Sequence, residues 1–131
     1  MSPFDDKPLY RVVRDVALAL HGLDLQSATL ESEVRQSSAA LYLNTVLLLR
    51  SEAPQKRRRY ASRIGGKIAR LDAALELAGP TIDREPLRRQ LGEAWDLVQR
   101  VRAELRPGQA SADRSADRQQ TGLGGTDVDD G

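Results

Sequence analysis

Two helical stripes run side by side between residues 56 and 78, and this double pattern constrains the fold more than any other feature of the sequence. The first stripe is basic and has spacings of 3, 4, 4 and 3: Lys56, Arg59, Arg63, Lys67 and Arg70. The second stripe is apolar and has spacings of 4, 4, 3, 4 and 3: Tyr60, Ile64, Ile68, Leu71, Leu75 and Ala78. Both sets of spacings are those of an α-helix. Because the stripes are offset by one residue, about 100° around the axis, one edge of this helix packs inward while the next presents positive charge.

The first third of the chain contains two further helical patterns. Apolar residues recur at helical spacing from Leu9 to Leu23, which predicts a short first helix. A second helix is expected to follow an N-cap at Ser27 or Thr29, whose side-chain oxygen can accept an amide proton of the first turn, and to end near Ser51. The stripe that should face the core has six members: Leu30, Val34, Ser37, Leu41, Thr45 and Leu48.

The second helix carries more apolar residues than one face of a bundle can bury. Between residues 39 and 49 they point in nearly every direction around the axis: Leu41, Leu43, Val46, Leu47, Leu48 and Leu49. A helix that is apolar all round is buried all round, whereas a small bundle covers roughly half of each helix. The surplus predicts a second contact surface, most simply another subunit.

Proline and glycine mark the ends of the last two helices. Pro54 is compatible with the first turn of the helix that carries the two stripes, and Gly79–Pro80 ends it. A fourth helix is expected from about Asp83 to Pro107–Gly108, with a heptad-like seam of Leu87, Leu91, Ala94, Val98, Val101 and Leu105. No stretch shows the alternation of a strand. The predicted fold is all-α, an antiparallel up-down-up-down four-helix bundle over residues 1–107.

Residues 108–131 differ from the rest in composition. Ser, Ala, Asp, Arg, Gln and Gly dominate, and the tetrapeptide Ser-Ala-Asp-Arg occurs twice in succession from Ser111. Such a segment has nothing with which to bury a core, so we predict a disordered tail. Its net charge of −3 leaves open that it folds back over the basic stripe, although a solvated tail without a role is the favoured interpretation.

The overall net charge of +1 hides an uneven distribution. Residues 50–70 contain eight basic residues and one acidic residue, Glu52, so their net charge is +7 and that of the remaining chain is −6. No acidic residue follows this run before Asp72, and like charges on one helix repel unless an anion is bound. We therefore predict that seven residues bind nucleic-acid phosphates: Lys56, Arg57, Arg58, Arg59, Arg63, Lys67 and Arg70. The competing interpretation is a solvated helix face.

Aromatic residues make up only 4% of the chain, which is too few for stacking platforms that read bases. Tyr60 and Trp95 are the candidates for stacking, and core packing is the favoured role for each. We therefore expect recognition of shape and backbone, with an affinity that falls steeply with salt. RNA is favoured over DNA as the ligand.

The sequence offers little for catalysis or for a metal. There is no cysteine, and His21 is the only histidine and is expected at the surface, so the usual nitrogen and sulfur ligands of zinc are missing. Gly65-Gly66-Lys67 lies inside a helix rather than after a strand, so it is not a P-loop. Each glycine there costs about 1 kcal/mol relative to alanine, so its presence needs a reason. Close packing against another helix is favoured over the approach of a ligand to the backbone. We predict no catalytic residue, no metal, no cofactor and no enzymatic activity.

Targeting signals are also missing from the sequence. The apolar residues between Ala39 and Leu49 are interrupted and fall short of the roughly 20 residues that span a bilayer. The N-terminus lacks the charged and apolar regions of a signal peptide. Together with the absence of cysteine, this leads us to expect a cytoplasmic protein that does not bind membranes.

The order of these segments resembles the four-helix bundle family of Avd, the accessory variability determinant of diversity-generating retroelements, and of the related rRNA intervening-sequence bundle proteins. The resemblance covers about residues 8–106. It lies in a first helix that starts with a tyrosine, Tyr10-Arg-Val-Val-Arg-Asp-Val-Ala-Leu-Ala-Leu, and in the apolar segment Ala39-Ala-Leu-Tyr-Leu-Asn-Thr-Val-Leu-Leu-Leu-Arg. It continues through a polar and basic link into the helix from Tyr60 to Gly79, which is followed by the final helix.

This resemblance implies a basic homo-oligomer, a pentamer in Avd, that binds nucleic acid and a partner reverse transcriptase. The leading hypothesis is thus a non-enzymatic, nucleic-acid-binding accessory protein. The alternative is a structural homo-oligomeric bundle that binds a protein partner without nucleic acid. A helix-turn-helix repressor comes third, because no pair of short helices joined by a tight turn stands out.

Overall fold

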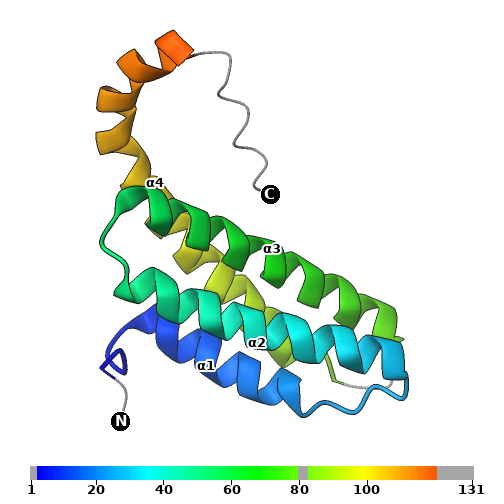
Figure 1. Cartoon of the computed structure of the whole chain (residues 1–131). Coiled ribbons are helices and arrows are strands. Elements are labelled where there is room, and N and C mark those ends of the chain that lie inside the picture. Colours follow the sequence, from blue (N-terminus) through cyan, green and yellow to red (C-terminus); the bar gives the residue numbers. More distant parts are fainter. Residues whose placement is uncertain (1–2, 80–82, 121–131) are drawn as a thin grey trace.

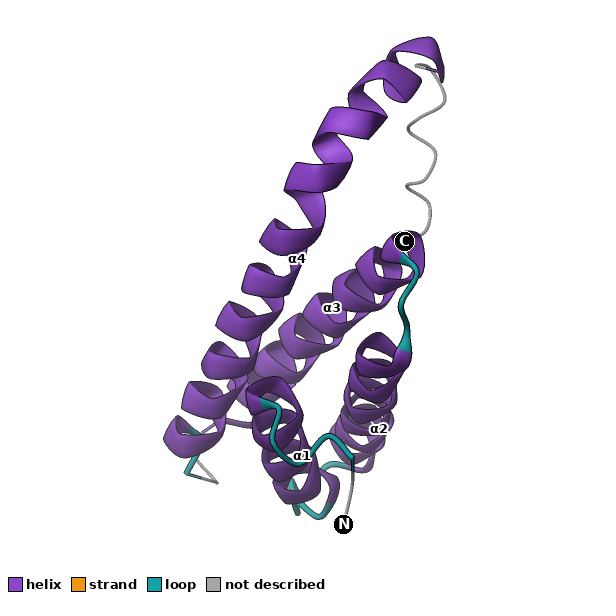
Figure 2. Ribbon diagram, turned by 90° about the vertical axis from the view of Figure 1, so that its left-hand side faces the viewer, coloured by secondary structure: helices purple, strands orange, loops and turns teal. Residues whose placement is uncertain are grey.

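The computed structural model describes residues 3–79 and 83–120, of which residues 106–120 are described as helical backbone only. The described chain is all-α (Figure 1) and forms α1 (Pro8–His21), α2 (Ala28–Arg50), α3 (Pro54–Ala78) and α4 (Glu85–Gln120). Each helix packs against the next, and α1 also packs against α4, which closes the ring of four (Figure 2). The predicted four-helix bundle is confirmed.

Local signals set the helix boundaries. Pro8 and Pro54 occupy the first turns of α1 and α3, where a missing amide proton costs nothing. Ser27 is the N-cap of α2, and its hydroxyl oxygen accepts a hydrogen bond from the amide of Leu30 at 3.3 Å. Gly79 follows α3 with a φ of 73°, a left-handed conformation that glycine adopts without strain. Of the two predicted caps of α2, the structure selects Ser27.

The predicted stripes form the core. Every member of the apolar stripe of α3 is buried except Tyr60 and Ala78, which are half-buried. In α4 the first four seam residues are buried and the last two are half-buried. The fully enclosed side chains come from all four helices and include Val13, Leu20, Leu41, Leu48, Ile64, Leu71, Leu75, Leu91 and Val98. Within the described residues, no helix combines the length and the apolarity that a bilayer crossing requires.

The C-terminal boundary of α4 differs from the prediction. The helix does not end at Pro107–Gly108 but continues to Gln120, so α4 has 36 residues and extends beyond the other helices (Figures 1 and 2). A proline inside a helix removes one backbone hydrogen bond and clashes with the preceding turn, yet the helix can resume after it with a kink. For residues 121–131 the predicted tail lies outside the described part of the chain.

Polar groups inside α2 are satisfied within the same helix. The Thr45 hydroxyl donates to the carbonyl of Leu41 at 2.8 Å, and the Ser38 hydroxyl donates to the carbonyl of Arg35 at 3.2 Å. By contrast, Tyr10 of α1 and Tyr42 of α2 join two helices through their hydroxyls, which lie 3.0 Å apart at the edge of the bundle.

Apolar side chains remain exposed on the outer side of α2, as the surplus in its sequence predicts. Leu43 is 58% exposed and Leu47 is 43% exposed, and Leu18 of the neighbouring α1 is 70% exposed. These three leucines are hereafter called the outer leucines. A single bundle therefore leaves part of α2 uncovered.

Candidate nucleic-acid interface

Two ion pairs show how α3 is oriented in the bundle. Arg70 pairs with Glu33 of α2, so the basic stripe lies on the α2 edge of α3. Asp72 pairs with Arg88 of α4, so the opposite edge of α3 faces α4. Between the two edges lies the outward face of α3, where every residue from Ser62 to Ala73 that points outward is small or basic.

Arg70 is neutralised by the protein itself. Its guanidinium donates two hydrogen bonds to the carboxylate of Glu33, from Nε at 2.8 Å and from Nη2 at 3.0 Å. The hydroxyl of Ser37 donates to the same carboxylate at 2.7 Å. These hydrogen bonds, from Arg70 first and Ser37 second, lower the pKa of Glu33 to about 2, and the nearby charge of Lys67 acts in the same direction. Arg70 therefore serves the α2–α3 contact.

Arg57 is also engaged within the fold. Its Nη1 donates to the carbonyl of Leu48 at 3.1 Å and to the carbonyl of Ser51 at 3.2 Å. These carbonyls belong to the last turn of α2 and to the residue after it, where backbone acceptors lack partners within the helix. Arg57 thus closes the end of α2 and fastens the short connection to α3, so it is not available to a ligand in this arrangement.

The five other basic residues have no such partner. No carboxylate of the described side chains lies within 4.0 Å of Lys56, Arg58, Arg59, Arg63 or Lys67. These five residues are hereafter called the free cations.

The free cations extend over about three turns of α3. The guanidinium of Arg63 lies over the ring of Tyr60, 5.9 Å from its centroid, a cation–π contact that keeps the guanidinium at the surface. Arg58 lies apart from the stripe, on the α4 edge, because it precedes Gly65 by two helical turns. The free cations therefore line the α2 edge and touch the α4 edge at the N-terminal end of α3.

Two of the outer leucines, Leu43 and Leu47 of α2, lie beside this charge. The contacts of Arg70 with Glu33 and of Arg57 with Leu48 show that α2 and α3 run antiparallel in a fixed register. In that register Leu43 and Leu47 are level with residues 57–61 of α3. An apolar surface and a cationic surface thus adjoin at this end of the bundle.

The α4 edge of α3 has a different electrostatic character. Arg88 of α4 donates to Asp72 at 2.8 Å and 3.2 Å and to Glu76 at 2.8 Å. The paired charges compensate one another, and the hydrogen bonds to Asp72 raise the pKa of Arg88 further. Around Asp72 and Glu76, this edge offers an anion no cluster of unpaired cations.

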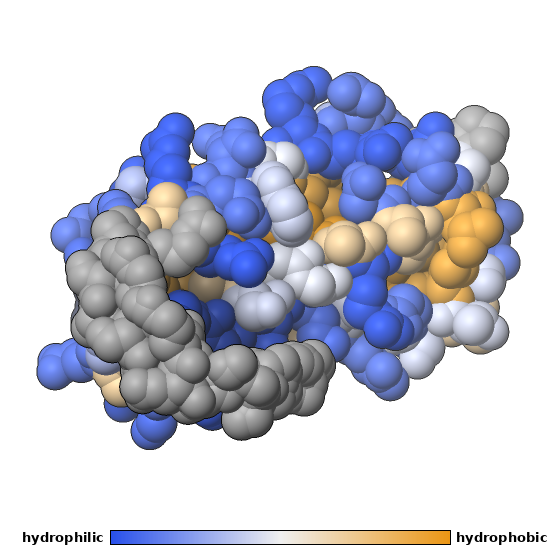
Figure 3. All heavy atoms as spheres, turned by 90° about the horizontal axis from the view of Figure 1, so that it is seen from above, coloured by the Kyte–Doolittle hydropathy of each residue, from blue (hydrophilic) through white to orange (hydrophobic). Residues whose placement is uncertain are grey.

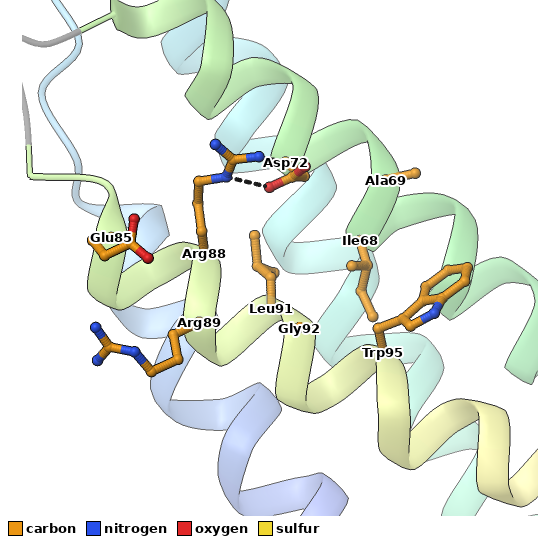
Figure 4. A pocket seen from close by; sticks show the side chains of 9 residues that line it. All are labelled: Ile68, Ala69, Asp72, Glu85, Arg88, Arg89, Leu91, Gly92 and Trp95. Carbon is orange, nitrogen blue, oxygen red and sulfur yellow. Dashed lines mark hydrogen bonds and ion pairs between the residues drawn. The ribbon is translucent and has the colours of Figure 1, made fainter.

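Trp95 lies on this same edge, and its predicted place in the core is wrong. The side chain is 41% exposed and lies in a groove between α3 and α4 (Figure 4). The indole rests against Gly65, where an added Cβ would be 3.3 Å from the ring. Gly66 has nothing within 4 Å of an added Cβ. Close packing therefore explains Gly65 and leaves Gly66 unexplained.

Other candidate residues are as expected or are unremarkable. His21 is exposed, and Tyr60 is half-buried against the core. Among the described residues, no group of three or more His, Cys, Asp or Glu side chains is placed to hold a metal ion.

The fold and its charged helix edge define a class of molecule, an all-α bundle that presents a cationic ridge beside an apolar surface. Comparison with known proteins finds no match, either to a protein family, to a curated protein or to a solved structure.

Proposed function

We propose that this chain is a non-enzymatic, nucleic-acid-binding accessory protein of the cytoplasm, an Avd-like partner of a reverse transcriptase in a diversity-generating retroelement. One observation carries the nucleic-acid part of the proposal. The free cations have no carboxylate partner among the described side chains, whereas Arg70 on the same stripe is paired. Cations gathered on one helix repel one another, and a bound polyanion relieves that repulsion.

The chemistry of the free cations favours the nucleic-acid backbone as the ligand. Arginine presents a planar fork that matches two phosphate oxygens, while lysine contributes a point charge. Phosphate contacts position a nucleic acid without reading its sequence. RNA is favoured over DNA as the ligand.

Self-association is the second part of the proposal. The outer leucines offer an apolar surface that a second copy of the chain can cover, and the resemblance implies a pentamer. Because Leu43 and Leu47 adjoin the free cations, subunits that meet there bring their cationic ridges close together. A ring of subunits would then present a longer cationic surface than one bundle alone.

Removing the charge of three free cations tests nucleic-acid binding. Arg57 and Arg70 are left intact because they hold the fold. In the test variant Arg59, Arg63 and Lys67 are changed to Gln, and a matched control changes the exposed residues Arg11, Arg35 and Arg100 to Gln, with the same loss of charge.

Binding is measured by the anisotropy of labelled RNA over a series of salt concentrations. We expect the test variant to bind more weakly and its plot of log affinity against log salt to lose about 0.7 of slope for each lost contact to a single strand. The control variant should behave like the unmodified protein. Equal loss in both variants would mean that net charge, and not this ridge, governs binding.

The alternative is a structural bundle that self-associates or binds an acidic protein without nucleic acid. The outer leucines favour it, because their exposure supports a protein contact whether or not nucleic acid binds. Sedimentation with and without RNA separates the two functions. Oligomers that form equally without RNA, and that never co-sediment with it, would support the alternative.

A further inference from the structure

The groove between α3 and α4 contains the only tryptophan of the chain. Its volume is about 480 Å³, and Figure 4 shows Ile68 of α3 beside the indole of Trp95, with Leu91 and Gly92 on the preceding turn of α4. The Cζ3 edge of the ring lies against Gly65, and the side chain remains 41% exposed. An indole that is held in place and open to solvent can stack on another planar ring.

The groove and the basic stripe are separated only by small side chains. Residues three apart on a helix are neighbours, with about 5–6 Å between their Cβ atoms. One such row leads from Arg59 through Ser62 to Gly65, against which Trp95 rests. Seen from above (Figure 3), a band of light-coloured and apolar residues lies between hydrophilic margins on this side of the molecule. No long side chain of the row stands between the cation and the aromatic ring.

A second row crosses the outward face one turn further along α3. It leads from Arg63 through Gly66 to Ala69, which lines the groove. Gly66 costs about 1 kcal/mol of helix stability and has open space around it, so packing within the bundle does not explain its presence. A larger side chain at Gly66 would stand between the basic stripe and the groove.

We propose that the α3–α4 groove binds an unpaired nucleobase, which stacks on Trp95 while the phosphates of the same strand lie on the free cations. The inference rests on the proposed function and names its ligand more closely, as a single strand of RNA or DNA. A base in a duplex is stacked on both faces and cannot enter the groove, whereas every unpaired base offers a ring face to the indole. Phosphates on Arg59 and Arg63 bring such a base across Ser62 and Gly66.

The charges of the two edges of α3 agree with phosphates on the α2 edge and a base on the α4 edge. The phosphates carry the negative charge and meet the unpaired cations, while the base is neutral and meets an edge where Arg88 is already compensated by Asp72 and Glu76. Arg58, on the α4 edge, is placed to hold the phosphate next to the stacked base. An acidic peptide would satisfy the cations but has no use for the aromatic ring.

Trp95 itself reports on the test, because it is the only tryptophan in the chain. The full-length protein is titrated with four oligonucleotides of the same length: single-stranded RNA, single-stranded DNA, the DNA duplex, and an abasic DNA strand that keeps the phosphates and lacks the bases. Tryptophan fluorescence reports on stacking, and the anisotropy of labelled oligonucleotides reports on binding. Polyglutamate serves as an anion without phosphates or bases.

We expect both single strands to quench Trp95, since RNA and DNA share the base chemistry, and the duplex and the abasic strand to bind without quenching. Trp95→Ala should weaken single-strand binding by about 5- to 150-fold, the range found for one base stacked on an aromatic side chain, and should leave abasic binding unchanged. Trp95→Phe should retain most of the affinity. Leu77→Ala, which removes an exposed apolar side chain of α3 outside the groove, is the matched control.

The possible failures can be told apart. If the single strands and the abasic strand bind equally and no ligand quenches Trp95, the base site is wrong and the proposed function stands. If no oligonucleotide binds, both are wrong. If polyglutamate quenches Trp95 as strongly as a single strand does, this face of α3 takes an acidic protein, and the base site is again overturned.

Discussion

The two edges of α3 contain the same kinds of charged residue and use them differently. On the α4 edge, Arg88 meets Asp72 and Glu76, and its charge is compensated within the bundle. On the α2 edge, Glu33 forms an ion pair with Arg70, and the cations nearer the N-terminus of α3 face a stretch of α2 with no carboxylate between Glu33 and Arg50. The neighbouring helix, and not the number of arginines, decides which charges remain available for a ligand.

Arginines with two different roles also lie within three residues of one another on α3. Arg57 holds the carbonyls at the end of α2, while Arg59 is exposed and unpaired. Both residues belong to one basic run in the sequence. Their roles diverge because Arg57 points toward the last turn of α2, whereas Arg59 points toward solvent.

The largest effect on stability is expected from this pair. Arg57→Ala removes two charge-assisted hydrogen bonds to the carbonyls of Leu48 and Ser51 and should lower the free energy of unfolding by about 1–3 kcal/mol. Arg59→Ala, at an exposed position, should change it by less than about 0.5 kcal/mol. Nucleic-acid affinity should respond in the opposite order. Urea unfolding gives the order of the two variants in stability, and RNA titration gives their order in affinity. If the same variant lost more of both, the two arginines would not have separate roles.

The adjacent glycines of α3 should give effects of intermediate size. Gly66→Ala should raise the free energy of unfolding by about 1 kcal/mol, because alanine has the better helix propensity and the site is open. Gly65→Ala should give a smaller gain or a loss, because its Cβ would be 3.3 Å from the Trp95 ring, which must move. Urea denaturation gives the stabilities, and the emission maximum of Trp95 shows whether the indole has shifted. Equal gains in both variants would mean that the indole yields freely.

The smallest effect on stability is expected from the ion pair between Glu33 and Arg70, the last residue of the basic stripe. The pKa of Glu33 is about 2 in the folded protein and about 4.5 as its ordinary value. Because folding lowers this pKa, the ionised carboxylate contributes stability at pH values above 4.5, and the contribution is lost as the pH falls from 4.5 toward 2. Because the pair is exposed and screened by solvent, we expect this contribution to be smaller than the effects of the arginine and glycine variants.

Glu33→Gln tests that pH dependence. The variant should be less stable than the unmodified protein at neutral pH, and the difference should shrink below pH 4.5. Free energies of unfolding measured by urea at a series of pH values provide the comparison. A difference that stays constant down to pH 2 would show that Glu33 acts through packing rather than through its charge.

The helices could be predicted from the sequence because their signals are local. The periodic stripes identify the buried face of each helix, and Ser27, Pro54 and Gly79 mark boundaries through the chemistry of their own residues. The end of α4 was mispredicted at Pro107, because a proline weakens a helix without always ending it. The two stripes of α3 could therefore be recognised without knowing which helices are neighbours.

The availability of the site residues could not be predicted in this way. Whether an arginine is paired depends on residues far away in the sequence, as with Glu33, which is 37 positions from Arg70. Trp95 follows Leu91 by four residues, a spacing that predicts packing at the edge of the seam. The ring instead lies in the groove because Gly65, on the other helix, leaves room for it there. Such pairings are properties of the packed bundle.

The hydroxyls enclosed in α2 have a consequence for how the helices stay aligned. Ser38 and Thr45 bond to carbonyls of their own helix, so they form no link to another helix. Interhelical register is therefore left to apolar shape and to links at the rim, such as the hydroxyls of Tyr10 and Tyr42. In homologous chains the enclosed hydroxyls can be exchanged for methyl groups at little cost, while the rim contacts should vary together, each with its partner.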